Sequence, residues 1–336
     1  MTCRRICFCL LICFFPGRVH LATAQDTACV HRTLTLNVFN SGGGLVRGLE
    51  PADFEGKLGG KAVQILSVKP DERPHRIAVL LDTSGAVLGQ PDAEEWVAAN
   101  TVAFHIAKAP LQNTSLALFL FSDKINEQLD FSKGALAAAK RLEEIRGNAE
   151  YAREYLHGKT SPRDAILAAM QLVGDPRFSD SIYVIGDGAD NQSRNGAHAV
   201  RDALVSRGVR LYISMLSFGS VSGMSDWDRR SAESDPIEIS ELSSASGGLV
   251  FGRFGVGPLR KVIYVLKPGE GQATGNLLAS MYSGMTRNDL IEIQLPEPVN
   301  DWKKWSLDLS SSRKKAHKDW FVVYPQELAP CSALTH

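Results

Sequence analysis

The feature that most constrains this fold is an alternation of short apolar runs with amphipathic segments, which begins near Arg76. The runs Ile77 to Leu81, Leu116 to Phe121 and Ser181 to Ile185 are almost continuously apolar, which is typical of parallel strands buried on both faces of a sheet. Helical periodicity follows between them, for example over Arg163 to Val173. The pattern predicts an α/β fold: a doubly wound, Rossmann-like, mostly parallel sheet.

β-rich segments flank this region on both sides. Arg32 to Phe39 and Ala62 to Val68 alternate polar and apolar residues, as do Leu290 to Leu295 and Trp305 to Leu309, and this alternation is typical of half-buried strands. We therefore predict four parts: a signal peptide over residues 1–24, a β-rich N-terminal extension over 25–75, the α/β domain over 76–255, and a last helix with a β-rich C-terminal extension over 256–336.

The first residues indicate export. Arg4 and Arg5 precede the apolar run Ile6 to Phe15, and an Ala-x-Ala cleavage site ends at Ala24. This is the organisation of a secretory signal peptide. The alternative is a membrane anchor, but a span needs about 20 apolar residues. We predict a secreted or periplasmic protein with no membrane span after cleavage.

The charge balance argues against a nucleic-acid partner. The chain has 37 Lys and Arg residues and 37 Asp and Glu residues. Arg4, Arg5 and Arg18 lie in the predicted signal peptide, so the remaining chain is slightly acidic. A nucleic-acid-binding surface requires a clear basic excess.

The cysteines fall into two groups. Four of the six lie in the predicted signal peptide: Cys3, Cys7, Cys9 and Cys13. A removed segment cannot be a metal site, so only Cys29 and Cys331 remain. In an oxidising compartment this pair is a candidate disulfide that would join the two ends of the domain. Two free thiols, or a bond to another chain, are the alternatives.

Polar residues gather at the ends of three predicted elements. Asp82 and Ser84 follow one strand, Asp187 follows another, and Thr160 precedes a helix. A parallel α/β sheet presents its ligand crevice at the carboxyl ends of its strands. Because hard divalent cations prefer oxygen ligands, these residues are candidate ligands for Mg²⁺, or for Mn²⁺ or Ca²⁺. An open coordination position would accept a carboxylate from a partner.

These three stretches, in this order, resemble the three loops of the von Willebrand factor type A (VWA) domain over residues 75–255. The β-rich flanks also resemble a secreted bacterial subgroup of that family. The resemblance implies a metal-ion-dependent adhesion site (MIDAS) and a role in cell adhesion or protein binding. Asp82 and Ser84 match its first loop, Thr160 its second and Asp187 its third.

One position departs from the family pattern. The first loop has Ala86 where the family has a second serine, so one oxygen ligand is missing and a water would have to replace it. The alternative is a metal-free domain that keeps the fold. In that case Asp82 and Asp187 would cap turns and helix starts.

Together these features predict an exported binding protein, not an enzyme, whose partner is a protein or surface ligand with an acidic group. No base or nucleophile is poised for chemistry, and no Gly-x-Ser-x-Gly elbow is present. One alternative is a metal-free interaction module of an envelope assembly. Another is a metal-dependent hydrolase that uses Asp82 and Asp187; it would need a second metal, and only Asp190 adds a carboxylate nearby.

Three further segments carry expectations. Gly219 to Ser234 is polar and predicts a long surface loop, and the basic run Arg313 to Lys315 predicts a solvated hairpin turn. The strand-like segments of the tail hold four aromatic residues that we expect to pack the tail against the core: Trp302, Trp305, Trp320 and Phe321. An exposed binding patch is the alternative.

Overall fold

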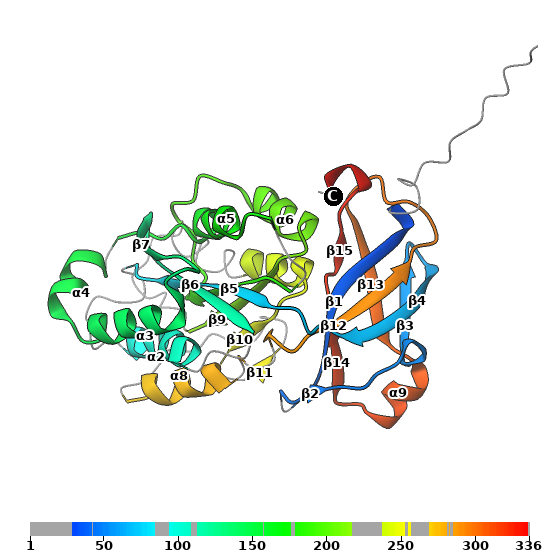
Figure 1. Cartoon of the computed structure of the whole chain (residues 1–336), viewed down its shortest axis with the longest axis horizontal. Helices are drawn as coiled ribbons and strands as arrows, with labels where there is room; N and C mark the ends of the chain where they lie inside the picture. The colour runs from blue at the N-terminus through cyan, green and yellow to red at the C-terminus, as the bar shows by residue number, and fades with distance from the viewer. Residues whose placement is uncertain are drawn as a thin grey trace, which may run out of the picture.

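The computed structural model describes residues 29–41, 43–84, 94–108, 113–156, 158–175, 179–216, 237–252, 255–256, 269–280, 282 and 285–334. The predicted signal peptide with its cleavage site after Ala24, the position Ala86 and the predicted loop Gly219 to Ser234 lie outside these residues. Within the described ranges, no helix has both the length and the apolar character needed to cross a bilayer. Figure 1 shows two bodies side by side, called here the α/β body and the β body.

The α/β body is built on a seven-stranded sheet. Its strands are β5 (His75–Asp82), β6 (Thr114–Phe121), β7 (Ile125–Leu129), β8 (Ser181–Gly186), β9 (Arg210–Met215), β10 (Val250–Gly252) and β11 (Gly255–Val256). They lie in the order β11-β10-β9-β8-β5-β6-β7. The strands from β10 to β6 are parallel, and the edge strands β11 and β7 run antiparallel to their neighbours.

Helices cover both faces of this sheet (Figure 1). One face packs against α2 (Glu94–Lys108), α3 (Gly134–Ile145), α4 (Ala149–Tyr155) and α8 (Gly271–Ser280). The other packs against α5 (Pro162–Val173), α6 (Ala197–Ser206) and helical residues 237–246. Along β5, Ile77, Val79 and Leu81 join the first core, and Ala78 and Leu80 join the second. The apolar runs of the sequence are continuous because each buried strand contributes side chains to two cores. The predicted α/β class is correct.

The β body combines the two predicted extensions into one antiparallel sheet. Its strands are β1 (His31–Asn40), β2 (Leu45–Val46), β3 (Phe54–Leu58), β4 (Lys61–Pro70), β12 (Asp289–Gln294), β13 (Lys303–Leu309), β14 (Trp320–Val323) and β15 (Glu327–Leu328). Its short helices are η1 (Pro51–Asp53), α9 (Ser311–Ala316) and η3 (Cys331–Ala333). The order is β14-β1-β12-β4-β3-β13-β15, with β2 also on β1, so strands from the two ends of the chain interleave.

A single stretch of chain near the C-terminus supplies both edge strands of this sheet, β14 and β15. β14 pairs with β1, and β15, which follows after Pro325, pairs with β13. The indole Nε1 of Trp305 donates to the Pro325 carbonyl at 2.6 Å and fixes this crossing. Unpaired strand edges promote aggregation, and here both edge strands are short, since β14 has four residues and β15 has two.

The β body has an apolar core of its own. Trp305, Leu307 and Leu309 of β13 point into it with Phe54 and Leu58 of β3. This corrects the expectation for the tail aromatics. Trp305 and Trp320 pack within the β body and Phe321 stacks on Phe39, whereas Trp302 faces the α/β body, where the Arg201 guanidinium lies 4.5 Å from its ring centroid.

A disulfide joins Cys29 to Cys331 across 302 residues, with their Cα atoms 5.4 Å apart. It ties the segment before β1 to η3, so the covalent loop that it closes contains the whole α/β body. In the chain-entropy model a loop of this length contributes on the order of 5 kcal/mol to stability.

One local prediction was wrong. The basic run Arg313 to Lys315 is not a hairpin turn but lies in α9, because Arg313 pairs with Asp53 and Lys314 with Asp308, both at 2.5 Å, and these contacts hold the segment against the β body. The predicted last helix is α8, which begins at Gly271.

Helix α4 was not predicted, although the sequence contains a capping signal. The Asn148 side chain accepts hydrogen bonds from the backbone N–H groups of Glu150 and Tyr151, both at 3.0 Å. Asparagine is among the strongest N-cap residues.

Candidate functional site

Two adjacent strands bring the candidate carboxylates together. β5 and β8 are parallel neighbours with Leu81 opposite Ile185, so Asp82 ends one strand where Asp187 follows the other. Gly186 makes room for this approach, since a Cβ atom there would lie 2.9 Å from the Cβ of Asp82. A larger residue would displace the Asp82 side chain from the end of β8.

The candidate hydroxyl residues converge on the same carboxylate. Thr160 Oγ1 donates to Asp82 Oδ2 at 3.0 Å, and the Ser84 backbone N–H donates to Asp82 Oδ1 at 2.8 Å. The Ser84 hydroxyl is buried beside the same carboxylate. Asp187 Oδ1 accepts a hydrogen bond from the Ala189 backbone N–H at 2.9 Å. The sheet edge thus holds all four predicted residues in one buried cluster.

The cluster concentrates negative charge in a dry environment. Asp82 is only 2% exposed and Asp187 8%. Burial, and then the charge of Asp187, raises the pKa of Asp82 to about 7. No basic side chain pairs with Asp82 within the described part of the chain. A divalent cation would supply the missing positive charge, so these residues fit such an ion.

The number of carboxylates limits how an ion could be held. No group of three or more His, Cys, Asp and Glu side chains among the described residues is placed to bind a metal. Two carboxylates with hydroxyl groups and waters are a typical Mg²⁺ environment.

Hydrogen bonds to neighbouring strands position the first two loops. Thr83 donates to the Phe121 carbonyl from both its backbone N–H and its hydroxyl, at 2.7 and 2.9 Å. Ser161 does the same to the Ser122 carbonyl, at 2.9 Å in both cases. Asn126 of β7 donates to the hydroxyls of Thr83 and Ser122, both at 3.1 Å.

Sequence reasoning missed Asn191, which joins the second loop to the third. Its Oδ1 accepts from the Thr160 backbone N–H at 2.9 Å, and its own N–H donates to the Thr160 carbonyl at 3.2 Å. Beside it, Arg163 Nε lies 2.7 Å from Asp190 Oδ2. The only signal in the sequence was an asparagine in a short polar loop, since its partner lies 31 residues away.

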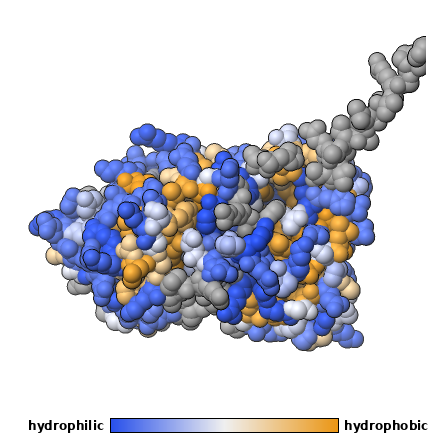
Figure 2. All heavy atoms as spheres, in the orientation of Figure 1, coloured by the Kyte–Doolittle hydropathy of each residue, from blue (hydrophilic) through white to orange (hydrophobic). Residues whose placement is uncertain are grey.

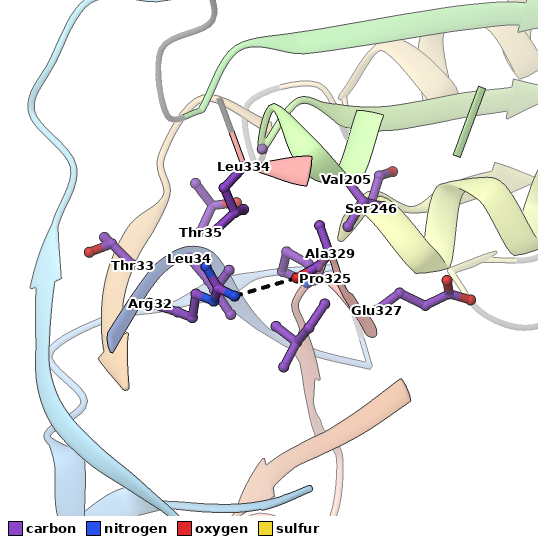
Figure 3. A pocket seen from close by; sticks show the side chains of 12 residues that line it. Arg32, Thr33, Leu34, Thr35, Val205, Ser246, Pro325, Glu327, Ala329 and Leu334 are labelled. Atoms are coloured by element: carbon purple, nitrogen blue, oxygen red, sulfur yellow. Dashed lines mark hydrogen bonds between the residues drawn. The ribbon is translucent and has the colours of Figure 1, made fainter. Parts of the chain in front are cut away.

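The junction between the two bodies offers a weaker candidate site. A pocket of about 40 Å³ lies there, between Val205 and Ser246 on one side and Arg32, Thr35 and Ala329 on the other (Figure 3). Arg32 Nη2 donates to the Ala329 carbonyl at 3.4 Å. Such a volume holds a few waters, whereas pockets for small organic ligands have about 300 Å³ or more.

The surface shows no dominant apolar patch on the face in Figure 2, where hydrophobic residues form several areas separated by hydrophilic ones. Among the described residues the large exposed hydrophobic side chains are Leu66, Leu136 and Ile237, which lie on different elements. Scattered apolar residues of this kind are normal and do not mark an interface.

No protein-family model and no curated protein matches the sequence. Similar solved structures include an aerotolerance-related membrane protein from Bacteroides fragilis, with 18% identity over 62% of this chain and 98% of that chain and a TM-score of 0.41. BatB from Bacteroides thetaiotaomicron is similar at 18% identity, 63% and 98% coverage and a TM-score of 0.41. A von Willebrand factor type A protein from Catenulispora acidiphila is similar at 9% identity, 91% and 76% coverage and a TM-score of 0.42. Likeness at this level transfers no activity or partner to this chain.

Proposed function

We propose that this chain is an exported binding module that holds one divalent cation at Asp82, Ser84, Thr160 and Asp187. Through that ion it binds an acidic group of a protein or a surface polymer. The observation that carries the proposal is the buried convergence of these residues on Asp82, with Thr160 Oγ1 at 3.0 Å from Asp82 Oδ2.

The chemistry of the residues supports a hard cation. Asp82 and Asp187 would supply the charged oxygens, and the buried Ser84 hydroxyl beside Asp82 would supply a neutral one. When bound, the ion would offer an open coordination position to a partner carboxylate. The chain's own residues would hold the oxygens in place and exclude water from one side of the ion.

The two alternatives are less well supported. A metal-free interaction module would use Asp82 and Asp187 as turn caps, and each does accept a hydrogen bond from the backbone N–H two residues further on. Turn capping alone does not require the two carboxylates to be buried beside each other, where charge is costly. Metal-dependent hydrolysis by a two-metal mechanism needs further carboxylates, and Asp190 is already paired with Arg163.

Cation binding is tested by thermal unfolding and calorimetry of the mature protein with Mg²⁺, Mn²⁺ or Ca²⁺. Binding to the folded state alone stabilises it by about 2.7 kcal/mol at 100 times the Kd. We expect a saturable rise in Tm for the unaltered chain and for the control Asp319→Asn, an exposed carboxylate of the β body.

The variant that tests the site itself is Asp82→Asn, which keeps the shape of the side chain and removes its charge. We expect this variant to be at least as stable as the unaltered chain without metal, and to show no Tm response to the cations. If the unaltered protein takes up no cation, the metal-free module becomes the better description.

Export is part of the same proposal. The Cys29–Cys331 disulfide fits an oxidising compartment. Intact mass of the protein recovered from its native compartment should show cleavage after Ala24 and the mass of the oxidised pair. A protein retained with residues 1–24 would contradict export by cleavage.

A further inference from the structure

A buried arginine lies at the opposite end of the sheet from the candidate cation site. Arg210 is the first residue of β9, at the amino ends of the parallel strands where the β body meets the α/β body. It is 0% exposed. A guanidinium group stays protonated in proteins, so this position carries a buried positive charge.

The contacts of Arg210 leave two hydrogen-bond donors without acceptors. Nε donates to the Gly247 carbonyl at 2.5 Å, Nη1 donates to Asn288 Oδ1 at 2.6 Å, and the guanidinium lies 5.0 Å from the ring centroid of Tyr212. In the described structure, Arg210 Nη2 and Asn288 Nδ2 have no hydrogen-bond partner. Asn288 is also 0% exposed, and it belongs to the segment that leads into the β body.

Neighbouring arginines each have a carboxylate partner, which Arg210 lacks in the described structure. Arg76 Nη2 lies 2.5 Å from Asp180 Oδ2, and Arg73 Nε lies 2.7 Å from Asp71 Oδ1. Arg210, by contrast, makes no ion pair within the described ranges.

The carboxylate closest in sequence does not fill this gap. Asp289 follows Asn288 directly, but its Oδ1 lies 3.6 Å from Arg47 Nη1. A buried charge without a counter-charge is destabilising, so an anion at this junction would stabilise the folded protein.

We propose that Arg210 and Asn288 bind a small monovalent anion of the halide class, such as chloride, between the two bodies. An anion accepts hydrogen bonds from both open donors and also neutralises the guanidinium, whereas a water would do only the first. Because Arg210 lies in the α/β body and Asn288 directly precedes β12 of the β body, the bound anion would help to hold the two bodies together. This site is independent of the cation proposal.

The test compares salts at equal ionic strength. Thermal unfolding of the unaltered chain in sodium chloride and in sodium gluconate should give a Tm about 2 °C higher in chloride at ten times the Kd, and the effect should saturate. Crystals soaked in sodium bromide should show an anomalous peak that bridges Arg210 Nη2 and Asn288 Nδ2.

Two variants complete the test. Arg210→Met should abolish the chloride dependence, and the control Arg141→Met, which removes a partly exposed arginine of α3, should retain it. If Arg210→Met does not fold, the bromide experiment on the unaltered protein decides. A water or no density at that position, or equal Tm values in both salts, would overturn the proposal.

Discussion

In the part of the chain that the structure describes, the two ends of the parallel strands carry unpaired buried charges of opposite sign. At the carboxyl ends, Asp82 is buried beside Asp187 with no basic group paired to it in the described structure. At the amino ends, Asp180 is paired with Arg76, and the buried base Arg210 has no acidic partner among the described residues.

This comparison distinguishes charged side chains that form ion pairs within the protein from those that could bind a ligand. The buried carboxylates Asp53, Asp71 and Asp180 each have an arginine beside them. Groups with perturbed charge and no protein counter-ion are the ones expected to meet something from solution, and such groups cluster at functional sites.

The largest effect should follow from breaking a matched pair. Asp180→Ala leaves the Arg76 guanidinium, which is 19% exposed, without its carboxylate. Removing one partner of a buried pair costs about 3–5 kcal/mol. Urea unfolding should show this loss, whereas Asp202→Ala, which removes an exposed partner of Arg201, should cost about 1 kcal/mol or less. Equal losses would mean that burial does not distinguish the two pairs.

The next effect is a pH dependence from the unmatched acid. The folded-state pKa of Asp82 is raised to about 7, so the folded protein holds a proton that the unfolded chain releases near its ordinary pKa. The stabilisation is present at low pH and is lost as the pH rises through 7. Without divalent cations we expect the unaltered chain to lose about 2 kcal/mol between pH 5 and pH 7 relative to Asp82→Asn. Parallel pH profiles for the two proteins would contradict the raised pKa.

The smallest effect tests how the acidic end is positioned. Asn191→Ala removes the acceptor for the Thr160 N–H, which lies 2.9 Å from Asn191 Oδ1. We expect cation affinity to fall about tenfold, which corresponds to about 1.4 kcal/mol. Asn191→Asp keeps the acceptor and should retain most of the affinity. The measurement is Mn²⁺ titration by electron paramagnetic resonance, and unchanged affinity in the alanine variant would show that Thr160 is positioned by other contacts.

The sequence predicted the carboxyl end of the sheet better than the amino end. Asp82, Thr160 and Asp187 were recognisable because polar residues directly after buried strands must meet at one rim of a parallel sheet. Arg210 was not recognised, since an arginine at the start of a strand usually reaches solvent, and this one is buried by tertiary packing against Gly247, Tyr212 and Asn288. Asn191 acts through hydrogen bonds to the Thr160 backbone, and such contacts cannot be predicted from a pattern of residue types.

The β body was the least predictable part for a similar reason. Alternating polarity identified β1, β4, β12 and β13 as strands, but it carries no information about their partners. His31 lies opposite Gln294, a pairing that depends on the folded α/β body in between. The basic run in α9 was misjudged because its partner Asp53 is also far away in sequence.

The interleaved strands also have a consequence for biosynthesis. β1 cannot find its partner β12 until the ribosome has translated as far as Gln294, which at about 5–20 residues per second takes on the order of 10 to 50 s. During that interval β1, β3 and β4 form an apolar, incompletely paired surface on a nascent chain. A chaperone or export factor that holds this segment until the last strands emerge would therefore raise the yield of folded protein.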